Sequence, residues 1–123
     1  MSLSKTEEQL MEFIWQRGKV FMKDLIDIYP DPKPAPTTVA TLLKRMQEKR
    51  VIAYKQCGNS REYYPLIAKS NYFSNHVHGL IKTYFNHSPL KFASFFASET
   101  NLSIEELEEL RSLINSEIKN KKR

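Results

Sequence analysis

The 123-residue chain has one cysteine, three glycines and one tryptophan, and it lacks long apolar runs. A single cysteine, Cys57, excludes an internal disulfide and leaves a cysteine-based metal site without its usual companions. No stretch approaches the roughly 20 apolar residues that a membrane-spanning helix needs. The N-terminus also lacks the cationic and apolar segments of a signal peptide. We therefore expect a small cytoplasmic protein that inserts into no membrane.

Residues that carry catalysis or hold cofactors are also scarce. The sequence has no glycine-rich phosphate loop and no run of metal ligands at a characteristic spacing. His76 and His78 fall on different sides of a helix, and His87 lies more than two turns further on. An enzyme would depend on Cys57 with a histidine, or on the acidic run at 105–109, which is more typical of a solvated helix start. We expect no enzymatic activity, no cofactor and no metal.

A cationic surplus is present instead, and it is concentrated in one segment. Nineteen Lys and Arg residues oppose fourteen Asp and Glu residues, a net charge of +5. Between Pro36 and Lys69, seven cations stand against two anions, so this segment alone accounts for the surplus. The seven are Lys44, Arg45, Lys49, Arg50, Lys55, Arg61 and Lys69. Such a patch favours a polyanionic partner, although a basic surface that binds nothing is the alternative.

The segment from Pro36 to Met46 predicts a helix with two contrasting faces. One face carries four apolar residues at helical spacing, which a core must cover: Val39, Leu42, Leu43 and Met46. The opposite face mixes short hydroxyls with long cations, a combination suited to base edges and phosphates in the major groove of DNA. Its members are Thr37, Thr41 and Lys44, flanked by Thr38 and Arg45. The alternative is an amphipathic helix whose outer face is merely solvated.

Two helices are expected before this segment. The first begins at a capping box, residues 4–7, and ends at Gly18, which tolerates the left-handed conformation of a helix end. Val20 can follow as a short extended segment, and the second helix ends at the proline-rich connector 30–36. Apolar residues at helical spacing form the buried faces of the two helices: Leu10, Phe13, Ile14, Met22, Leu25, Ile26 and Tyr29.

A β-hairpin is expected after the third helix. Residues 51–56 and 61–66 are rich in β-branched and aromatic side chains, and the turn-forming sequence 57–60 separates them. Three helices followed by a hairpin is the order of a winged helix, in which the second and third helices form a helix-turn-helix. The hairpin tip, which carries Lys55 and Arg61, would lie along the phosphate backbone.

The remainder, from Ser70 on, predicts roughly three helices with more apolar side chains than they can bury alone. A second capping box, residues 103–106, opens the last of them. We expect these side chains to pack against a second copy of the chain, and the alternative is that they fold back as the core of a monomer. The expected dimerisation residues are Phe73, Val77, Leu80, Ile81, Tyr84, Phe92, Phe95, Phe96, Leu107, Leu110 and Ile114.

The predicted fold class is therefore mainly α with a small β-hairpin. Residues 1–69 are expected to form a winged helix-turn-helix DNA-binding domain, and residues 70–123 a helical dimerisation domain.

These features resemble a known family over nearly the whole chain, the BlaI/MecI/CopY (penicillinase-repressor) family of bacterial winged-helix transcriptional repressors. Three segments carry the resemblance. Residues 3–15 are similar to the family's first helix, with an acidic start and a closing Ile-Trp. Residues 36–46 are similar to its recognition helix, and residues 102–110 to the start of its closing helix.

The resemblance implies a homodimeric repressor that occupies a dyad-symmetric operator and dimerises through its C-terminal helices. The sequence departs from the family at Ala40, where relatives carry a cation, so the preferred operator is expected to differ. Lys44, one turn on, partly replaces that charge. By position, the resemblance assigns contacts with the groove or the phosphates to Thr37, Thr38, Thr41 and Arg45, which agrees with the face derived from spacing.

The resemblance also bears on regulation. In the antibiotic-resistance branch of the family, a membrane sensor triggers cleavage between an Asn and a Phe, at the bond that aligns with Phe95-Phe96 here. This chain lacks the Asn. Cleavage within the apolar segment 94–97 would still weaken a dimer. A sensor-linked protease is therefore a candidate partner. The copper-sensing branch has paired cysteines near its C-terminus, which this chain lacks, so direct metal sensing is disfavoured.

The leading hypothesis is a sequence-specific transcriptional repressor that binds operator DNA as a homodimer and is released by proteolysis or dimer disruption. The alternative is a winged-helix protein-interaction module that docks another protein through the aromatic residues of segment 70–118 and lacks specific DNA binding.

Overall fold

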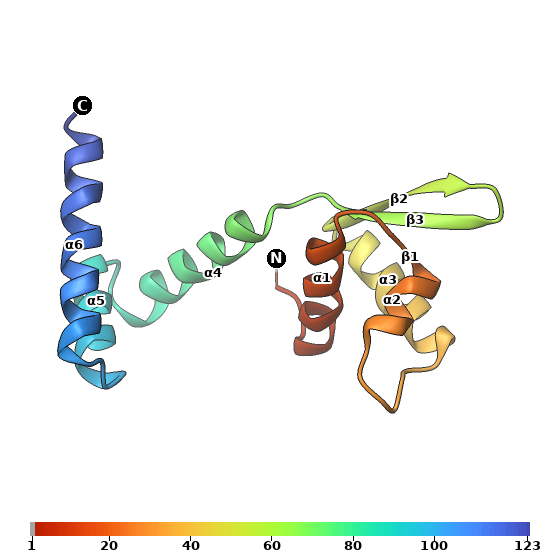
Figure 1. Ribbon diagram of the computed structural model, residues 1–123, viewed down its shortest axis with the longest axis horizontal. Helices are drawn as coiled ribbons and strands as arrows, with labels where there is room; N and C mark the ends of the chain where they lie inside the picture. Colours follow the sequence, from red (N-terminus) through yellow and green to blue (C-terminus); the bar gives the residue numbers. More distant parts are fainter. Residues whose placement is uncertain (1) are drawn as a thin grey trace. The chain divides into compact units, whose positions relative to one another are not determined.

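The computed structural model describes residues 2–123 (Figure 1). The elements of the first part of the chain are α1 (Lys5–Arg17), β1 (Val20–Phe21), α2 (Met22–Ile28), α3 (Pro36–Glu48), β2 (Ile52–Cys57) and β3 (Ser60–Pro65). They are followed by α4 (Lys69–Tyr84), α5 (Pro89–Glu99) and α6 (Ile104–Lys121). This mainly helical chain with a small antiparallel sheet confirms the predicted fold class.

Contacts divide the chain into two compact units, residues up to Ser74 and Asn75–Arg123. The first two turns of α4 therefore belong to the first unit and the rest of that helix to the second. The expected separation into functional domains at residues 69 and 70 stays a prediction.

Local signals account for the ends of α1. The Glu7 N–H donates to Ser4 Oγ at 3.2 Å and the Ser4 N–H donates to Glu7 Oε1 at 2.8 Å, which completes the predicted capping box. At the other end Gly18 has a φ of 77° and donates its N–H to the Ile14 carbonyl at 2.8 Å. Glycine adopts this φ without the strain that a side chain would cause, so Gly18 is suited to end the helix.

The helix-turn-helix is formed by α2 and α3. Lys33 in the connector donates to the carbonyls of Asp27 and Tyr29, at 2.9 and 2.8 Å, and thereby satisfies acceptors at the end of α2. Pro36 opens α3 at a position where its missing N–H costs nothing. The predicted apolar face of α3 is buried: Val39, Leu42, Leu43 and Met46.

The sheet has three strands in the order β1-β3-β2, all antiparallel. Val20 pairs with Tyr63, so the extended segment expected at Val20 is a strand, although its pairing was not predicted. The β2–β3 turn consists of Gly58 and Asn59, and Gly58 adopts the left-handed φ of 62° that the first position of such a turn favours.

The position of Pro65 differs from the prediction of an edge strand, because β3 lies in the middle of the sheet. Pro65 pairs with Ile52, and the flanking hydrogen bond runs from the Leu66 N–H to the Val51 carbonyl at 2.8 Å. The N atom of Pro65 therefore faces away from β2, toward the side where β1 pairs only with residues 62 and 63. A missing donor costs nothing there.

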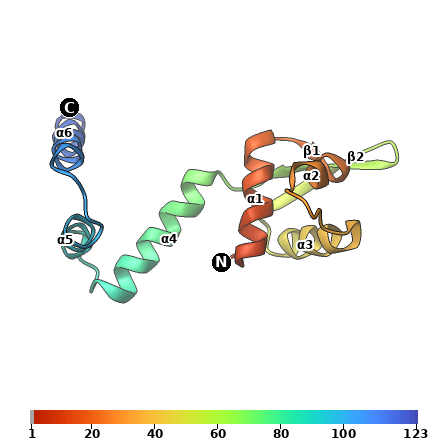
Figure 2. The same ribbon diagram turned by 60° about the horizontal axis from the view of Figure 1, so that its bottom comes forward.

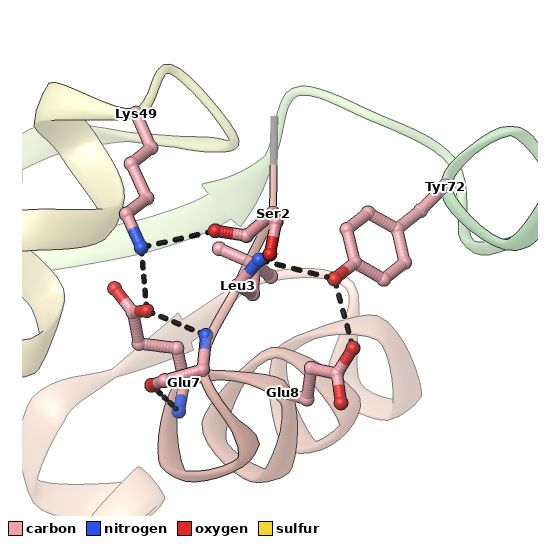
Figure 3. Close-up of polar contacts among 7 residues, drawn as sticks. Ser2, Leu3, Glu7, Glu8, Lys49 and Tyr72 are labelled. Atoms are coloured by element: carbon pink, nitrogen blue, oxygen red, sulfur yellow. Dashed lines mark hydrogen bonds and ion pairs between the residues drawn. The ribbon is translucent and has the colours of Figure 1, made fainter. Parts of the chain in front are cut away.

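The core of the first unit draws on every element of that unit. Its fully buried side chains are Leu10, Met11, Ile14, Leu25, Val39, Leu43, Met46 and Ile52. Glu7 is the exception to this apolar set, because it is only 2 % exposed and carries a charge. Its Oε1 accepts from Lys49 Nζ at 2.6 Å (Figure 3). This ion pair joins the first turn of α1 to the residue that ends α3.

The second unit consists of the rest of α4 with α5 and α6. Ser88 and Ser103 cap α5 and α6, and Ser103 forms the predicted capping box with Glu106. Phe85 packs edge-on against Phe92, with ring centroids 5.4 Å apart. No residue of α5 or α6 is buried, so these helices present apolar side chains to solvent.

The buried ion pair predicts a specific loss of stability. Lys49→Met keeps the side-chain stem and removes the ammonium group, leaving the Glu7 carboxylate buried without its cation. We expect a loss of about 1–2 kcal/mol in the free energy of unfolding near neutral pH, measured by urea denaturation. Lys69→Met is the matched control, because it breaks the more exposed Lys69–Glu12 pair and should cost less than about 0.5 kcal/mol.

The effect should depend on pH. Burial raises the pKa of Glu7, but hydrogen bonds from Lys49 and Ser4 outweigh it and hold the pKa below its usual 4.5. The ionised form therefore stabilises the fold at neutral pH, and this contribution disappears as the pH falls through the lowered pKa. The difference between wild type and Lys49→Met should narrow over that acid range. Equal stability losses in the Lys49 and Lys69 variants at neutral pH would contradict this account.

Candidate nucleic-acid interface

The outer face of α3 is formed by the five residues expected to face DNA, and all are exposed: Thr37, Thr38, Thr41, Lys44 and Arg45. They lie opposite the four buried apolar residues of the same helix. Thr41 Oγ1 donates to the Thr37 carbonyl at 2.9 Å. Its hydroxyl proton is therefore engaged within the helix, while its oxygen lone pair and its methyl group remain able to contact a ligand.

Fewer cations are available to a ligand in the structure than the sequence suggests. Lys49 pairs with Glu7 and Lys69 pairs with Glu12, at 2.6 and 2.7 Å, so two of the seven cations act within the fold. The other five form no ion pair among residues 2–123: Lys44, Arg45, Arg50, Lys55 and Arg61. The sequence could not separate the two groups, because both ion pairs join residues more than 40 positions apart.

The β2–β3 hairpin reaches beyond α2 and α3 at its turn (Figure 1, Figure 2). Its register places Lys55 opposite Glu62, and Gln56 opposite Arg61. Because neighbouring pairs point to opposite faces of a sheet, Lys55 and Arg61 lie on different faces. The face of Arg61 is the one that carries the buried Tyr63.

Arg61 is supported by an aromatic ring. Its guanidinium carbon lies 4.2 Å from the centroid of Tyr54, and the Tyr54 and Tyr63 centroids are 5.8 Å apart. A guanidinium group over a ring face is held by a cation–π interaction while its N–H groups stay available. Lys55 instead lines a separate hollow together with Lys19, Glu62 and Tyr64.

A hollow of about 570 Å³, which we call the wing notch, lies between the hairpin and the helix-turn-helix. It is lined by Phe21, Met22, Lys23, Ala40, Gln56, Asn59, Ser60, Arg61 and Tyr63. Two cations, Lys23 and Arg61, therefore share one hollow with amide and hydroxyl groups of the hairpin. Ala40 is the one residue of α3 that lines the notch, and its small side chain fills little of it.

The sequence identified Arg61 but missed the other polar residues of the notch. The pairing of Gln56 with Arg61 follows from the turn position, so strand alternation was a usable signal for Gln56. Lys23 had no such signal, since its approach to the hairpin depends on how α2 packs. Lys55 and Arg61, both expected to lie along the phosphate backbone, are in two different environments, and their contact with DNA stays a prediction.

The residues expected at a dimer interface lie on all three C-terminal helices. Exposure ranges from 38 % for Phe96 to 75 % for Tyr84, while Ile81, Phe92 and Leu110 are half-buried. Phe73 belongs to the first unit, where its ring packs against Trp15 at a centroid distance of 6.0 Å. An apolar groove of about 410 Å³ runs between α5 and α6, with a lining that includes Phe92, Phe96, Leu107, Leu110 and Ile114.

Neither a metal site nor a membrane span is found among residues 2–123. No group of three or more His, Cys, Asp or Glu side chains in that range is arranged to hold a metal ion. No helix there is long and apolar enough to cross a membrane. Cys57 is a free thiol at the end of β2.

The family follows from a comparison of sequence profiles, in which the penicillinase repressor profile matches residues 3–116. The chain belongs to the penicillinase repressor family. This confirms the predicted family, and the match extends from the residue before the capping box of α1 into α6.

Two relatives in the penicillinase repressor family are similar along their whole length. The methicillin resistance regulatory protein MecI of Staphylococcus aureus strain N315 is 28 % identical over 118 residues, which cover 92 % of this chain and 93 % of MecI. The penicillinase repressor of Bacillus licheniformis is 25 % identical over 122 residues, which cover 98 % and 94 %.

A solved structure supports the fold at a greater distance. The crystal structure of the oxidized form of MarR from E. coli superimposes with a TM-score of 0.51. The two chains are 12 % identical, and the superposition covers 95 % of this chain and 76 % of that one. At this level of identity the likeness concerns the fold alone.

Proposed function

We propose that this chain represses transcription by binding an inverted-repeat DNA operator as a homodimer. The observation that carries the proposal is the exposed outer face of α3, formed by three threonines and two cations in a family of repressors. The helix follows α2 in a helix-turn-helix, the arrangement that places a recognition helix in the major groove.

The chemistry of this face suits base edges. Arg45 has the planar fork of donors that pairs with guanine O6 and N7, and Lys44 supplies a second cation one residue before it. The methyl group of the exposed Thr41 is suited to contact with the methyl of thymine. Thr37 and Thr38 lie in the first turn of α3, where both hydroxyl groups and the Thr37 N–H can donate to phosphate. The Thr38 N–H is already engaged, since it donates to the Ala35 carbonyl at 3.0 Å.

The wing notch is suited to the DNA backbone beside that groove. A phosphate there would meet Lys23 and Arg61, whose charges come from α2 and β3. The resemblance described above places a cation of relatives at the position of Ala40. In this chain the notch supplies cations from neighbouring elements, and the small Ala40 leaves room for the phosphate. Lys55, on the other face of the hairpin, contributes through its longer-range field.

Dimerisation is supported by the apolar side chains of the second unit. The groove between α5 and α6 is lined almost entirely by apolar side chains, among them Phe92, Leu107 and Ile114. One winged helix neutralises few phosphates, so a monomer would bind weakly. A dimer makes the second half-site contact intramolecular, which raises the overall affinity without any new contact.

Release of the operator would follow from loss of the dimer. The Phe95-Phe96 bond lies within α5, and the two side chains are 51 % and 38 % exposed. Scission there would cut α5 in two and break the covalent connection between α4 and α6, which also carry apolar side chains expected at the dimer interface. Phe95 occupies the position of the Asn at which the resistance branch is cut. A sensor-linked protease acting here would therefore need to accept a Phe-Phe bond.

The first prediction of this proposal concerns DNA specificity. Selection from a random duplex pool by the purified protein should enrich an inverted repeat with half-sites about one helical turn, roughly 10 base pairs, apart. Arg45→Ala should weaken binding by about tenfold or more and relax the preference at one base position of each half-site. Arg17→Ala, at the exposed end of α1, is the matched control. Enrichment of no sequence by the wild type would instead favour the protein-interaction module.

The second prediction concerns the wing. Arg61→Ala and Lys23→Ala should each weaken binding uniformly across sequences and reduce the slope of log affinity against log salt concentration by about 1. Lys55→Ala, a change of equal charge on the opposite face, should have a smaller effect. Because Lys23 and Arg61 line one notch, their effects in a double-mutant cycle should be non-additive. If the two effects on affinity were strictly additive, Lys23 and Arg61 would contact different phosphates.

The third prediction concerns the oligomer. Light scattering at micromolar concentration should give twice the 14.5 kDa mass of one chain. Leu107→Lys together with Ile114→Lys introduces charges into the apolar groove and should produce a folded monomer with weakened operator binding. Leu66→Lys, at an apolar residue of the first unit that is 55 % exposed, is the control and should remain dimeric. A monomeric wild type would remove the dyad-operator mechanism.

A further inference from the structure

Tyr72 is one of the residues that attach the start of α4 to the rest of the first unit. Tyr72 is 3 % exposed and is the buried residue of α4. Its hydroxyl accepts the Leu3 N–H at 3.3 Å and donates to Glu8 Oε2 at 2.8 Å (Figure 3). Burial and the neighbouring Glu8 raise the pKa of Tyr72, so the hydroxyl keeps its proton and remains a donor at neutral pH.

The same N-terminal segment is attached to the end of the recognition helix. Lys49, which ends α3, donates to the Ser2 carbonyl at 3.2 Å and to Glu7 Oε1 at 2.6 Å (Figure 3). Leu3, next to Ser2, is 6 % exposed and packs in the core. Residues 2–8 therefore contact Lys49 on one side and Tyr72 on the other. We call this set of contacts the N-terminal clasp; its members are Ser2, Leu3, Glu7, Glu8, Lys49 and Tyr72.

Ring contacts reinforce the attachment of α4. Trp15 on α1 packs against Tyr72 and Phe73, with centroid distances of 5.8 and 6.0 Å. The indole Nε1 of Trp15 donates to the Ile67 carbonyl at 2.9 Å, just before α4 begins. Lys69 in the first turn of α4 pairs with Glu12 at 2.7 Å. The beginning of α4 is thus held against α1 by groups along two turns of helix.

This attachment has a geometric consequence for a dimeric repressor. α4 runs from Lys69 to Tyr84 without interruption, so its first turns lie in the winged-helix unit and its later turns in the second unit. The clasp fixes the start of α4 with respect to the end of α3 within the first unit. In the proposed dimer, the course of α4 would determine where the second recognition helix is presented.

We propose that the N-terminal clasp sets the half-site spacing that the dimer accepts, with Tyr72 as its positioning residue. The inference rests on the proposed dimeric repressor and adds the source of its spacing specificity. Each base pair inserted between half-sites rotates one of them by about 34–36° and moves it by about 3.4 Å. A fixed α4 cannot follow such a displacement, whereas a released α4 can.

The experiment measures binding to the selected inverted repeat and to duplexes in which its spacer is lengthened or shortened by one or two base pairs. The wild type should bind the altered spacers about tenfold more weakly than the original, and Tyr72→Phe should reduce this penalty to about threefold or less. Tyr72→Phe removes the hydroxyl and keeps the ring that packs on Trp15. Tyr64→Phe, which removes a tyrosine hydroxyl of the same unit outside the clasp, is the matched control.

Two further measurements separate positioning from stability. Affinity for a duplex with a single half-site should be nearly the same in Tyr72→Phe and wild type. The melting temperature should fall by only about a few degrees, because the variant loses the hydrogen bonds to Leu3 and Glu8 but keeps the packed ring. Glu8→Gln keeps an oxygen acceptor for the Tyr72 hydroxyl and should retain the narrow spacing preference, whereas Glu8→Ala should broaden it.

Each result bears on the proposal. An unchanged spacing profile in Tyr72→Phe would overturn it. Weaker half-site binding with the wild-type profile would also overturn it, because the clasp would then only stabilise the fold. If the wild type selects no inverted repeat, the dimeric repressor itself fails, and the spacing inference fails with it. The two failures are distinguishable. If the wild type binds its operator specifically and Tyr72→Phe keeps the same spacing profile, only the role of the clasp is refuted. If the wild type recognises no operator, the dimeric repressor is refuted.

Discussion

The first unit depends on a carboxylate buried in its core. Glu7 is 2 % exposed, and a charge in such a place must be met by donors. Its Oε1 receives the Ser4 N–H and the Lys49 ammonium, while Oε2 has no hydrogen-bond partner within residues 2–123. One oxygen therefore holds the start of α1, the N-terminal segment and the end of α3 in a single arrangement. A displacement of α3 relative to α1 would leave the Glu7 carboxylate buried without its cation, which is strongly destabilising.

The two units differ in how completely they bury their apolar side chains. In the first, α1, α2 and α3 bury their apolar faces against one another and the sheet, so its outer surface is free to carry cations and hydroxyls. In the second, α5 and α6 bury no residue completely and leave large apolar side chains in contact with water. Contiguous apolar surface of this kind is typical of an interaction site. In the proposed repressor, the first unit would bind DNA and the second would join two copies of the chain.

Features set by local chemistry were predictable from the sequence. Both capping boxes, the end of α1 at Gly18 and the two faces of α3 depend on residues within a few positions of one another, and the structure contains each of them. Features that join distant segments were not. The pairing of Val20 with Tyr63 involves a strand too short to show alternation. The use of Lys49 inside the fold, and of Tyr72 as an anchor, depends on partners more than 40 residues away. The candidate site divides in the same way, because the face of α3 was visible in the sequence and the wing notch was not.

The distribution of charge then follows from the packing. A cation of α3 either forms an ion pair within the protein or remains available to a ligand. Lys49, at the end of α3, forms an ion pair with the buried Glu7. The outer face retains Lys44 and Arg45, and Ala40 between them and the wing adds no charge. Lys23 and Arg61 restore positive charge at that point from two other elements. In the proposed complex, charge held on α2 and β3 would meet the DNA backbone beside the groove and leave α3 free to contact bases. The bases that α3 contacts could then vary without loss of the contacts that position the helix.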